Sequence, residues 1–194
     1  MRRFFTAGGK RRVVIDYAVT VALAIGLAVL IQAFIVKPYM IPSTSMAETL
    51  VPGQRVLVDR VVYHYRDVHR GDIVVFHKPV GAEEVLIKRV VGLPGDTLSL
   101  EDGRVYVNGQ PLREPYVRVV GGMSEPTTPG QGLGGPAIGW SLADPYTVPA
   151  GHYFVMGDNR TDSGDSRYFG TVPQENVIGR AVFSYWPPRR LGTL

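Results

Sequence analysis

The sequence predicts a mainly β protein, with one N-terminal transmembrane helix followed by a compact β-sheet or barrel-like domain. Two patterns support this fold class: a long apolar run near the start, and short runs with a period of two beyond it. No long amphipathic helical pattern competes with them. A chain of 194 residues has room for one membrane helix and one globular domain of ordinary size.

The first predicted element is a membrane helix over residues 13–36, which are almost wholly apolar apart from Asp16 and Gln32. Twenty-four residues give about 36 Å of helix, enough to cross a hydrocarbon core of about 30 Å. A cleaved signal peptide is the alternative, because residues 22–24 (Ala-Leu-Ala) resemble a cleavage site. The run continues twelve residues past Ala24, however, too long for a signal core of about 7–15 residues. We therefore expect a permanent anchor.

The charge distribution predicts how this anchor is oriented. The five basic residues among the first twelve precede any acidic residue, and setting them aside leaves 16 basic against 17 acidic side chains. Only Lys37 follows the apolar run closely. The positive-inside rule then places residues 1–12 in the cytoplasm and residues 37–194 outside. A globular part with almost no net charge makes nucleic acid an unlikely class of partner.

Beyond the anchor, the predicted strands follow one another as short β-branched or alternating runs. They cover residues 55–63, 72–76, 85–91, 97–100, 104–107, 153–156 and 181–185. Turn signals such as Pro94-Gly95, Asp102-Gly103 and Asn108-Gly109 bound them. Residues 121–139 carry seven glycines and three prolines, which indicates a flexible surface loop. Tyr185 and Trp186 could lie at a membrane interface or close the core.

Several kinds of site are disfavoured by composition. The absence of cysteine excludes a thiol nucleophile, a disulfide framework and a cysteine-ligated zinc site. The four histidines form no HExxH motif. The acidic segment 157–169 fails the EF-hand pattern, because Arg160 holds a ligand position and Phe169 stands where the closing glutamate belongs. We expect no cofactor and no metal.

The segment IPSTSM (residues 41–46) carries two serines just beyond the anchor. In an extended segment, side chains two apart project to the same side, so Ser43 and Ser45 would share a face. That arrangement suits a nucleophile and a second hydroxyl that donates to a developing oxyanion. A capping box, with Ser45 capping a short helix and Glu48 bonding back, explains the same residues. The segment alone leaves both interpretations open.

The adjacent cations Lys88 and Arg89 lie in a predicted strand, so they point to opposite faces that each carry apolar residues. Periodicity does not tell which of them is buried. Arginine is not a base in practice, whereas a desolvated lysine loses its proton readily. An ordinary lysine is neutral only about 0.04% of the time at pH 7, and lowering its pKa by two to three would make it a competent base. A surface lysine that extends into solvent is the alternative.

Four segments together resemble bacterial type I signal peptidases, whose boxes read PSxSM, GDxVVF, KRVVGxPGD and GDNRxxSxDSRxxG. This chain has PSTSM (42–46), GDIVVF (71–76), KRVVGLPGD (88–96) and GDNRTDSGDSRYFG (157–170), in the same order behind an anchor. The resemblance covers about residues 37–185, and its last two boxes are long enough to be highly specific. Two positions depart from the common pattern: Glu48 replaces a proline, and Thr161 replaces an aspartate.

The resemblance implies a role for each matched residue. Ser45 would be the nucleophile and Lys88 its general base. The supporting groups would be Ser43, which donates to the oxyanion, and Ser163, which orients Lys88. Asp165 and Arg167 would brace the site as a charge pair. The shallow substrate pockets would be lined by Tyr39, Ile41 and Ile87.

The implied function is a membrane-bound serine endopeptidase that removes signal peptides from translocated precursor proteins. Its partners would be those precursors and the lipid bilayer, with no nucleic acid and no metal. It would lie in the bacterial cytoplasmic membrane, with its catalytic domain on the outer face. Other serine hydrolases fit poorly, since neither GxSxG nor SxxK occurs. A self-cleaving repressor would carry a DNA-binding N-terminus rather than an anchor. A tethered β module that only binds a partner stays open.

Overall fold

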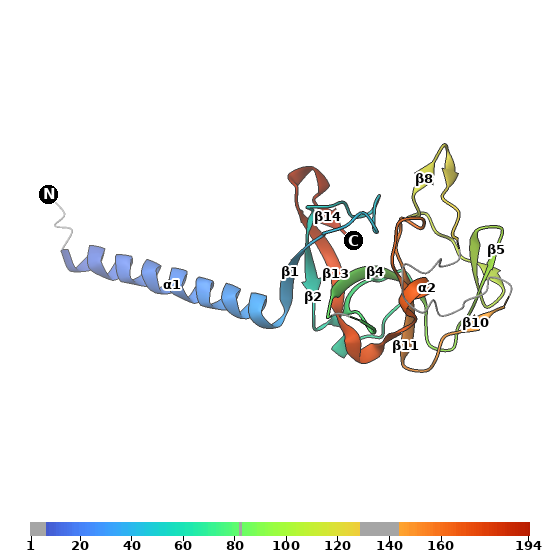
Figure 1. Cartoon of the computed structure of the whole chain (residues 1–194). Helices are drawn as coiled ribbons and strands as arrows, with labels where there is room; N and C mark the ends of the chain where they lie inside the picture. Colours follow the sequence, from blue (N-terminus) through green and yellow to red (C-terminus); the bar gives the residue numbers. More distant parts are fainter. Residues whose placement is uncertain (1–6, 82, 129–143) are drawn as a thin grey trace.

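The computed structural model describes residues 7–81, 83–128 and 144–194 of the chain. A long N-terminal helix projects from a β domain, as the sequence predicts, and the C-terminus lies within that domain (Figure 1). The three antiparallel sheets make the domain mainly β, which confirms the predicted fold class. The largest sheet curves around a core rather than lying flat (Figure 1).

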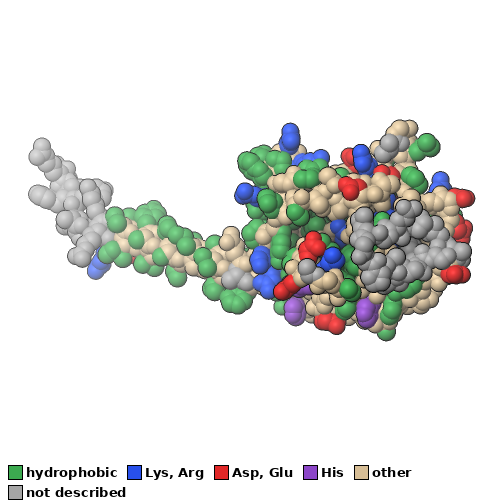
Figure 2. Space-filling model, viewed as in Figure 1, with side chains coloured by type: hydrophobic (Ala, Val, Ile, Leu, Met, Phe, Trp, Pro, Cys, Tyr) green, Lys and Arg blue, Asp and Glu red, His purple; other side chains and the backbone are tan. Residues whose placement is uncertain are grey.

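Helix α1 (Ala7–Phe34) contains a stretch, Arg12–Gln32, that is long and apolar enough to cross a membrane. Hydrophobic side chains cover its visible face, whereas charged side chains are scattered over the β domain (Figure 2). The helix ends at Phe34, and Pro38 then keeps Lys37 extended, because proline disfavours a helical residue directly before it. The Ile35 carbonyl accepts a bond from the Arg60 backbone N–H at 2.9 Å, so the helix passes directly into the sheet.

The main sheet holds eight antiparallel strands in the order β1-β2-β13-β3-β4-β11-β12, with β14 paired to β13. Their bounds are β1 (Val36–Met40), β2 (Arg55–Asp59), β3 (Ile73–His77), β4 (Val85–Gly92), β11 (His152–Met156), β12 (Val172–Pro173), β13 (Val177–Trp186) and β14 (Gly192–Thr193). Each predicted strand of this set is present, but the predicted strand over residues 55–63 is too long. Strand β2 ends at Asp59 and residues 62–64 form a short 3-10 helix, because the Asp59 carboxylate accepts bonds from the Val61 and Val62 N–H groups and turns the chain. Strand β1 was not predicted, because its first residue belongs to the apolar run assigned to the anchor.

A smaller sheet has the order β10-β5-β6-β7, and a separate hairpin pairs β8 with β9. Their bounds are β5 (Thr97–Glu101), β6 (Arg104–Val107), β7 (Gln110–Pro111), β8 (Val119–Val120), β9 (Met123–Ser124) and β10 (Tyr146–Thr147). The short helices are η1 (Val62–His64), α2 (Ser166–Phe169), η2 (Gln174–Asn176) and η3 (Pro188–Arg190). The predicted loop 121–139 includes β9 within its described part, and residues 129–139 lie outside the described residues.

The core positions the segment that carries the two serines. Ile41, Met46 and Leu50 are each at most 2% exposed and pack in one cluster with Val58 of β2 and Ile87 of β4. Buried side chains on both sides of residues 43–45 therefore hold that segment against the sheet. Two further clusters pack β11 against the smaller sheet and against the outer face of β3. Trp186 is 51% exposed, so it does not close the core.

Candidate active site

The serine segment forms turns rather than a helix. Within residues 43–50 the Ala47 N–H donates to the Thr44 carbonyl at 2.9 Å, and Glu48 is exposed. The Ser45 hydroxyl is buried and bonds to other side chains: Ser45 Oγ lies 3.1 Å from Ser43 Oγ. The two hydroxyls thus meet on one side, as predicted, although the segment is turned rather than extended. The capping-box interpretation has no helix to cap.

Lys88 reaches the same hydroxyl from strand β4. Its Nζ lies 2.5 Å from Ser45 Oγ, and the residue is 3% exposed. Burial lowers the pKa of Lys88 to about 8, because a low-dielectric site disfavours the charged amine. The carboxylates of Asp165, Glu84 and Asp158 partly oppose this effect. Lys88 is therefore a buried amine that loses its proton far more readily than an ordinary lysine.

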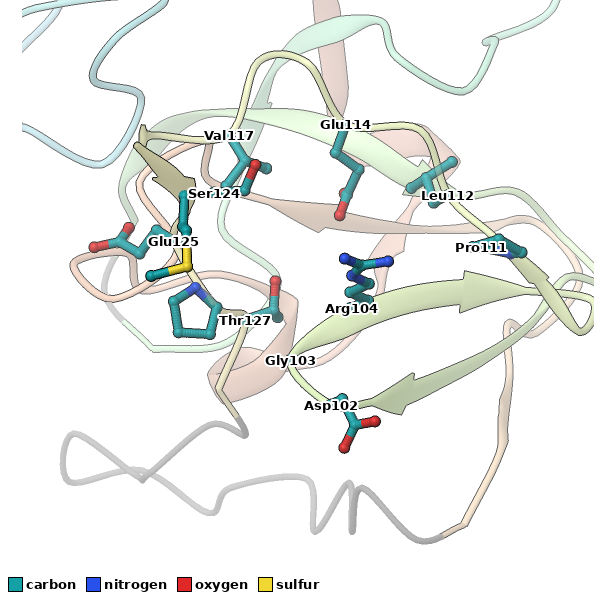
Figure 3. Close-up of a pocket in the computed structure, with 12 residues that line it drawn as sticks. Asp102, Gly103, Arg104, Pro111, Leu112, Glu114, Val117, Ser124, Glu125 and Thr127 are labelled. Atoms are coloured by element: carbon teal, nitrogen blue, oxygen red, sulfur yellow. The ribbon is translucent and has the colours of Figure 1, made fainter. Parts of the chain in front are cut away.

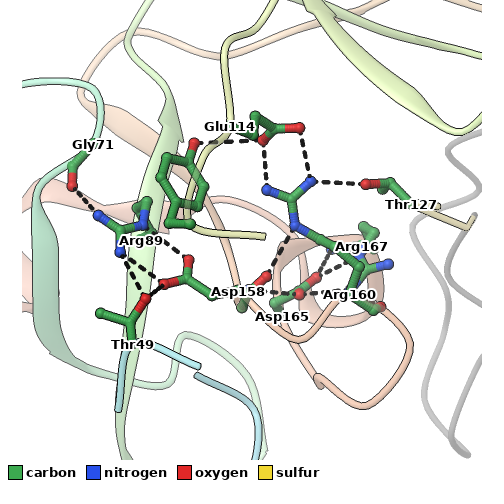
Figure 4. A network of polar contacts seen from close by, with 11 residues as sticks. Thr49, Gly71, Arg89, Glu114, Thr127, Asp158, Arg160, Asp165 and Arg167 are labelled. Atoms are coloured by element: carbon green, nitrogen blue, oxygen red, sulfur yellow. Dashed lines mark hydrogen bonds and ion pairs between the residues drawn. The ribbon is translucent and has the colours of Figure 1, made fainter. Parts of the chain in front are cut away.

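Arg89, the neighbour of Lys88, has a different role. It forms a two-pronged ion pair with Asp158, with Nε–Oδ1 at 2.8 Å and Nη2–Oδ2 at 2.7 Å. Its guanidinium also donates to the Gly71 carbonyl and stacks 4.0 Å from the Tyr116 ring centre. The Asp158 carboxylate accepts a further bond from Thr49 (Figure 4). This arrangement fixes strand β4 against the segment that follows β11, and so helps to position Lys88.

The segment after β11 is stabilised by a second buried ion pair, Arg167 with Asp165. Both side chains are fully buried, and they meet at 2.8 Å through two parallel bonds. Burial alone would raise the pKa of Asp165, but Arg167 and the Gly157 N–H lower it overall. Asp165 also caps α2 through the Arg167 N–H. These contacts hold residues 157–167 in one shape.

Three bonds fasten this segment to the serines. The Asn159 backbone N–H donates to the Ser45 carbonyl at 3.1 Å, and the Asn159 amide donates to the Thr44 carbonyl at 3.1 Å. The Thr44 hydroxyl donates to Asp162 Oδ2 at 2.5 Å. Gly157 makes the approach feasible, because a side chain there would begin 2.4 Å from the Ser45 carbonyl oxygen. The backbone around the candidate nucleophile is thus held from a distant part of the chain.

Ser163 lies beside the same glycine and is buried. Its hydroxyl is close enough to help lower the pKa of Asp165, but it makes no well-aligned hydrogen bond among the described residues. No bond from Ser163 to Lys88 occurs there either. The role of Ser163 in orienting Lys88 stays a prediction.

A small cavity of about 90 Å³ lies beside the two reactive groups. Ser45 and Lys88 share its lining with Tyr39, Ile41 and Ile87, which come from β1, the serine segment and β4. The structure therefore brings these five predicted site residues to one place. A cavity of this volume accommodates small side chains.

A larger cavity of about 490 Å³ lies beside the smaller sheet and contains neither Ser45 nor Lys88. Arg104 and Glu114 point into it from opposite sides (Figure 3). Across the described residues, no three histidine, aspartate or glutamate side chains are grouped to hold a metal ion.

Some residues that shape the site carried no assigned role in the sequence analysis. Asp158 and Asp162 lie within the GDNR box, so their position was a usable signal. Glu114 and Thr127 carried no signal, because they bind Arg160 only through the tertiary fold. Arg160 is 1% exposed, and its guanidinium also donates to the Gly157 carbonyl at 2.9 Å.

A serine hydroxyl in contact with a buried amine is the arrangement of serine hydrolases that use lysine as the base. Here it lies in a β domain attached to an apolar helix. The family described as signal peptidase, peptidase S26, matches residues 14–186 of the chain. Signal peptidase I of Leptolyngbya laminosa is 41% identical over 182 residues, covering 90% of this chain and 81% of its own. The chain belongs to the signal peptidase family, peptidase S26.

Other relatives extend this comparison. Signal peptidase I of Bacillus licheniformis is 36% identical over 181 residues, covering 92% of this chain and 91% of its own. A crystal structure of a signal peptidase I from Enterococcus faecalis V583 aligns with 59% of this chain and 97% of its own, at 36% identity and a TM-score of 0.44.

Proposed function

We propose that this signal peptidase removes signal peptides from precursor proteins with Ser45 as nucleophile and Lys88 as general base. The observation that carries the assignment is the contact of 2.5 Å between Lys88 Nζ and Ser45 Oγ inside a buried niche. Family membership makes the chain a serine peptidase that acts on signal peptides. The roles of individual residues are proposals, supported by the matched boxes and by the contact of Lys88 with Ser45.

The reaction begins with a proton transfer from Ser45 Oγ to the neutral amine of Lys88. The alkoxide attacks the scissile carbonyl, and the carbonyl oxygen becomes an oxyanion. The Ser43 hydroxyl and the Ser45 backbone N–H stabilise that charge. Lys88 then gives its proton to the departing amine, which leaves an acyl-enzyme. Water, deprotonated by Lys88, hydrolyses the ester and restores Ser45.

The lowered pKa of Lys88 supports its role as a base at neutral pH. With a pKa of about 8, roughly a tenth of Lys88 is neutral at pH 7. An ordinary lysine would be neutral several hundred times less often. Since the neutral amine is the reactive form, activity is expected to rise with pH up to about 8.

Two strand edges flank the cavity and suit an extended substrate. Among the described residues, β1 pairs only with β2, and residues Val85–Lys88 of β4 pair only with β3. A precursor segment laid between these edges would gain backbone hydrogen bonds on both sides. Tyr39, Ile41 and Ile87 would then form shallow pockets for small side chains before the scissile bond.

An N-terminal apolar helix indicates membrane anchoring, and we assign its orientation from charge. Residues 1–12 would be cytoplasmic, residues 13–36 would span the bacterial cytoplasmic membrane, and residues 37–194 would form the outer peptidase domain. Ser45 lies nine residues beyond Val36, so the anchor keeps the nucleophile near the outer leaflet. A translocated precursor whose signal helix is still in the bilayer would present its cleavage site there.

A cleavage assay on a secretory precursor tests the assignment. Ser45→Ala and Lys88→Ala should each abolish cleavage while circular dichroism stays unchanged, because each removes a reacting group. Lys78→Ala is the matched control, since Lys78 is a lysine outside the cavity that pairs with Glu84. If either site variant cleaved at a near wild-type rate, the dyad would be misassigned.

A further inference from the structure

A groove of about 570 Å³ lies where helix α1 enters the β domain. The end of the helix, the outer strand β1 and the residue after β2 form one side, and β3, β4 and β13 form the other. Representative lining residues are Phe34, Lys37, Arg60, His77, Val85 and Ile178. The groove contains neither Ser45 nor Lys88, and it shares only Tyr39 and Val85 with the catalytic cavity.

Two basic side chains, Lys37 and Arg60, give the groove its chemical character. Lys37 pairs with Val58 across the β1–β2 ladder, and Arg60 follows β2 directly, so both cations come from adjoining strands. The Lys37 ammonium lies 5.5 Å from the centre of the Tyr39 ring. Glu175 is the one carboxylate among the lining residues. Basic side chains also gather at this junction in the space-filling view (Figure 2).

The groove lies at the depth where lipid headgroups are found. Phe34 ends α1 with its side chain 68% exposed, and Lys37 follows after three residues. Three extended residues span about 10 Å at most, comparable to the polar layer of about 5–8 Å on each side of a bilayer. If α1 spans a membrane, Lys37 and the neighbouring Arg60 lie among the headgroups.

We propose that this junction groove binds the phosphate of an anionic phospholipid headgroup, an inference that rests on the membrane anchoring proposed above. A guanidinium and an ammonium from adjoining strands suit a phosphodiester, because arginine offers paired donors and lysine adds a point charge. The acyl chains would run along the exposed side chains of Phe34 and Ile35.

The groove has a structural link to the catalytic cavity. Tyr39 and Val85 line both. A headgroup bound in the groove therefore fixes the cavity at a set height above the leaflet, beside the path by which a precursor leaves the bilayer. The lipid would act as a positioning ligand and would take no part in the chemistry.

Direct binding tests the proposal without any measurement of cleavage, so its failure leaves the peptidase assignment intact. The full-length protein, in a neutral detergent free of phosphate, is titrated with short-chain phosphatidylglycerol, and binding is followed by ³¹P NMR. Parallel titrations use glycerol phosphate and a short-chain diacylglycerol. Lys37→Gln, Lys37→Arg and the double variant Lys37→Gln/Arg60→Gln are compared with Arg104→Gln, an exposed arginine on the smaller sheet.

We expect saturable binding of phosphatidylglycerol that is about fivefold weaker in Lys37→Gln and about 25-fold weaker in the double variant, since each interfacial cation contributes about 1 kcal/mol. Lys37→Arg and Arg104→Gln should bind like the wild type. Equal loss in Arg104→Gln, or equal binding of diacylglycerol, would overturn the site. Equal affinity for glycerol phosphate would mean a free-phosphate site. A signal-peptide fragment that competes with the lipid, and binds Lys37→Gln about fivefold more weakly, would make the groove a substrate subsite and would also overturn the proposal.

Discussion

Replacing Lys88 with methionine should stabilise the protein while it abolishes catalysis. The pKa of Lys88 falls from its ordinary 10.5 to about 8 on folding. Each step of one in this pKa difference corresponds to about 1.4 kcal/mol in the free energy of unfolding. Holding a charged Lys88 in the folded state therefore costs about 3 kcal/mol at neutral pH. Methionine has a similar length, buries well and carries no charge. Part of the gain is offset by the lost hydrogen bond to Ser45, worth about 1 kcal/mol.

The pH dependence of this effect separates it from packing. Below pH 8 both the folded and the unfolded chain carry a protonated Lys88, so the full cost is present. Between pH 8 and 10.5 the unfolded chain binds more protons than the folded one, so the wild type gains stability as pH rises. Denaturant unfolding of the full chain in detergent micelles measures the difference. Lys88→Met should be the more stable protein by about 2 kcal/mol at pH 7, and this advantage should vanish by about pH 10. A pH-independent difference, or a less stable variant at pH 7, would mean that burial of the charged amine does not destabilise the fold.

Further predictions concern the supporting groups. Ser43→Ala should lower kcat about 100-fold with little change in KM, because it removes an oxyanion donor, and a near wild-type kcat would exclude that role. Asp165→Asn should cost about 3–5 kcal/mol in urea unfolding, because it leaves the buried charge of Arg167 unpaired. The pKa of Asp165 is lowered, so its contribution is present above about pH 4 and lost below it; an identical acid profile in the variant would contradict this. A double-mutant cycle of Thr44→Val and Asp162→Asn on kcat/KM should show coupling above about 0.5 kcal/mol, whereas additive effects would mean that their bond does not position the nucleophile.

Much of the fold could be predicted because β-branched runs with period two mark strands in the sequence itself. Strands β3, β4 and β6 start and end within two residues of their predicted bounds. Strand β1 could not be predicted, because its first residue continues the apolar run of the anchor. The proline in β1 is consistent with its place at the edge of the sheet, where a missing N–H costs no ladder bond.

The proposed catalytic pair, Ser45 and Lys88, shows where local patterns stop being informative. Periodicity places Lys88 and Arg89 on opposite faces of the strand, but it does not tell which of them contacts Ser45. Ser45 lies 43 residues before Lys88 in the chain. Local spacing taken alone favours the capping box over a nucleophile at Ser45. Tertiary contacts decide both questions: Asp158 holds Arg89, and the contacts of Asn159 draw residues 44–45 against the same loop. The family resemblance indicates Ser45 and Lys88 as the pair, which spacing alone does not, because the matched boxes contain the residues that these tertiary contacts bring together.

The rate of acylation at Ser45 as a function of pH shows whether neutral Lys88 activates this serine. The full-length protein is reacted with a serine-directed acylating inhibitor, and the adduct is located and timed by mass spectrometry. We expect a single adduct on Ser45 whose rate of formation rises with pH and levels off near pH 8, and no adduct in Lys88→Ala. An adduct on another residue, or one that forms on Ser45 equally fast without Lys88, would contradict this expectation.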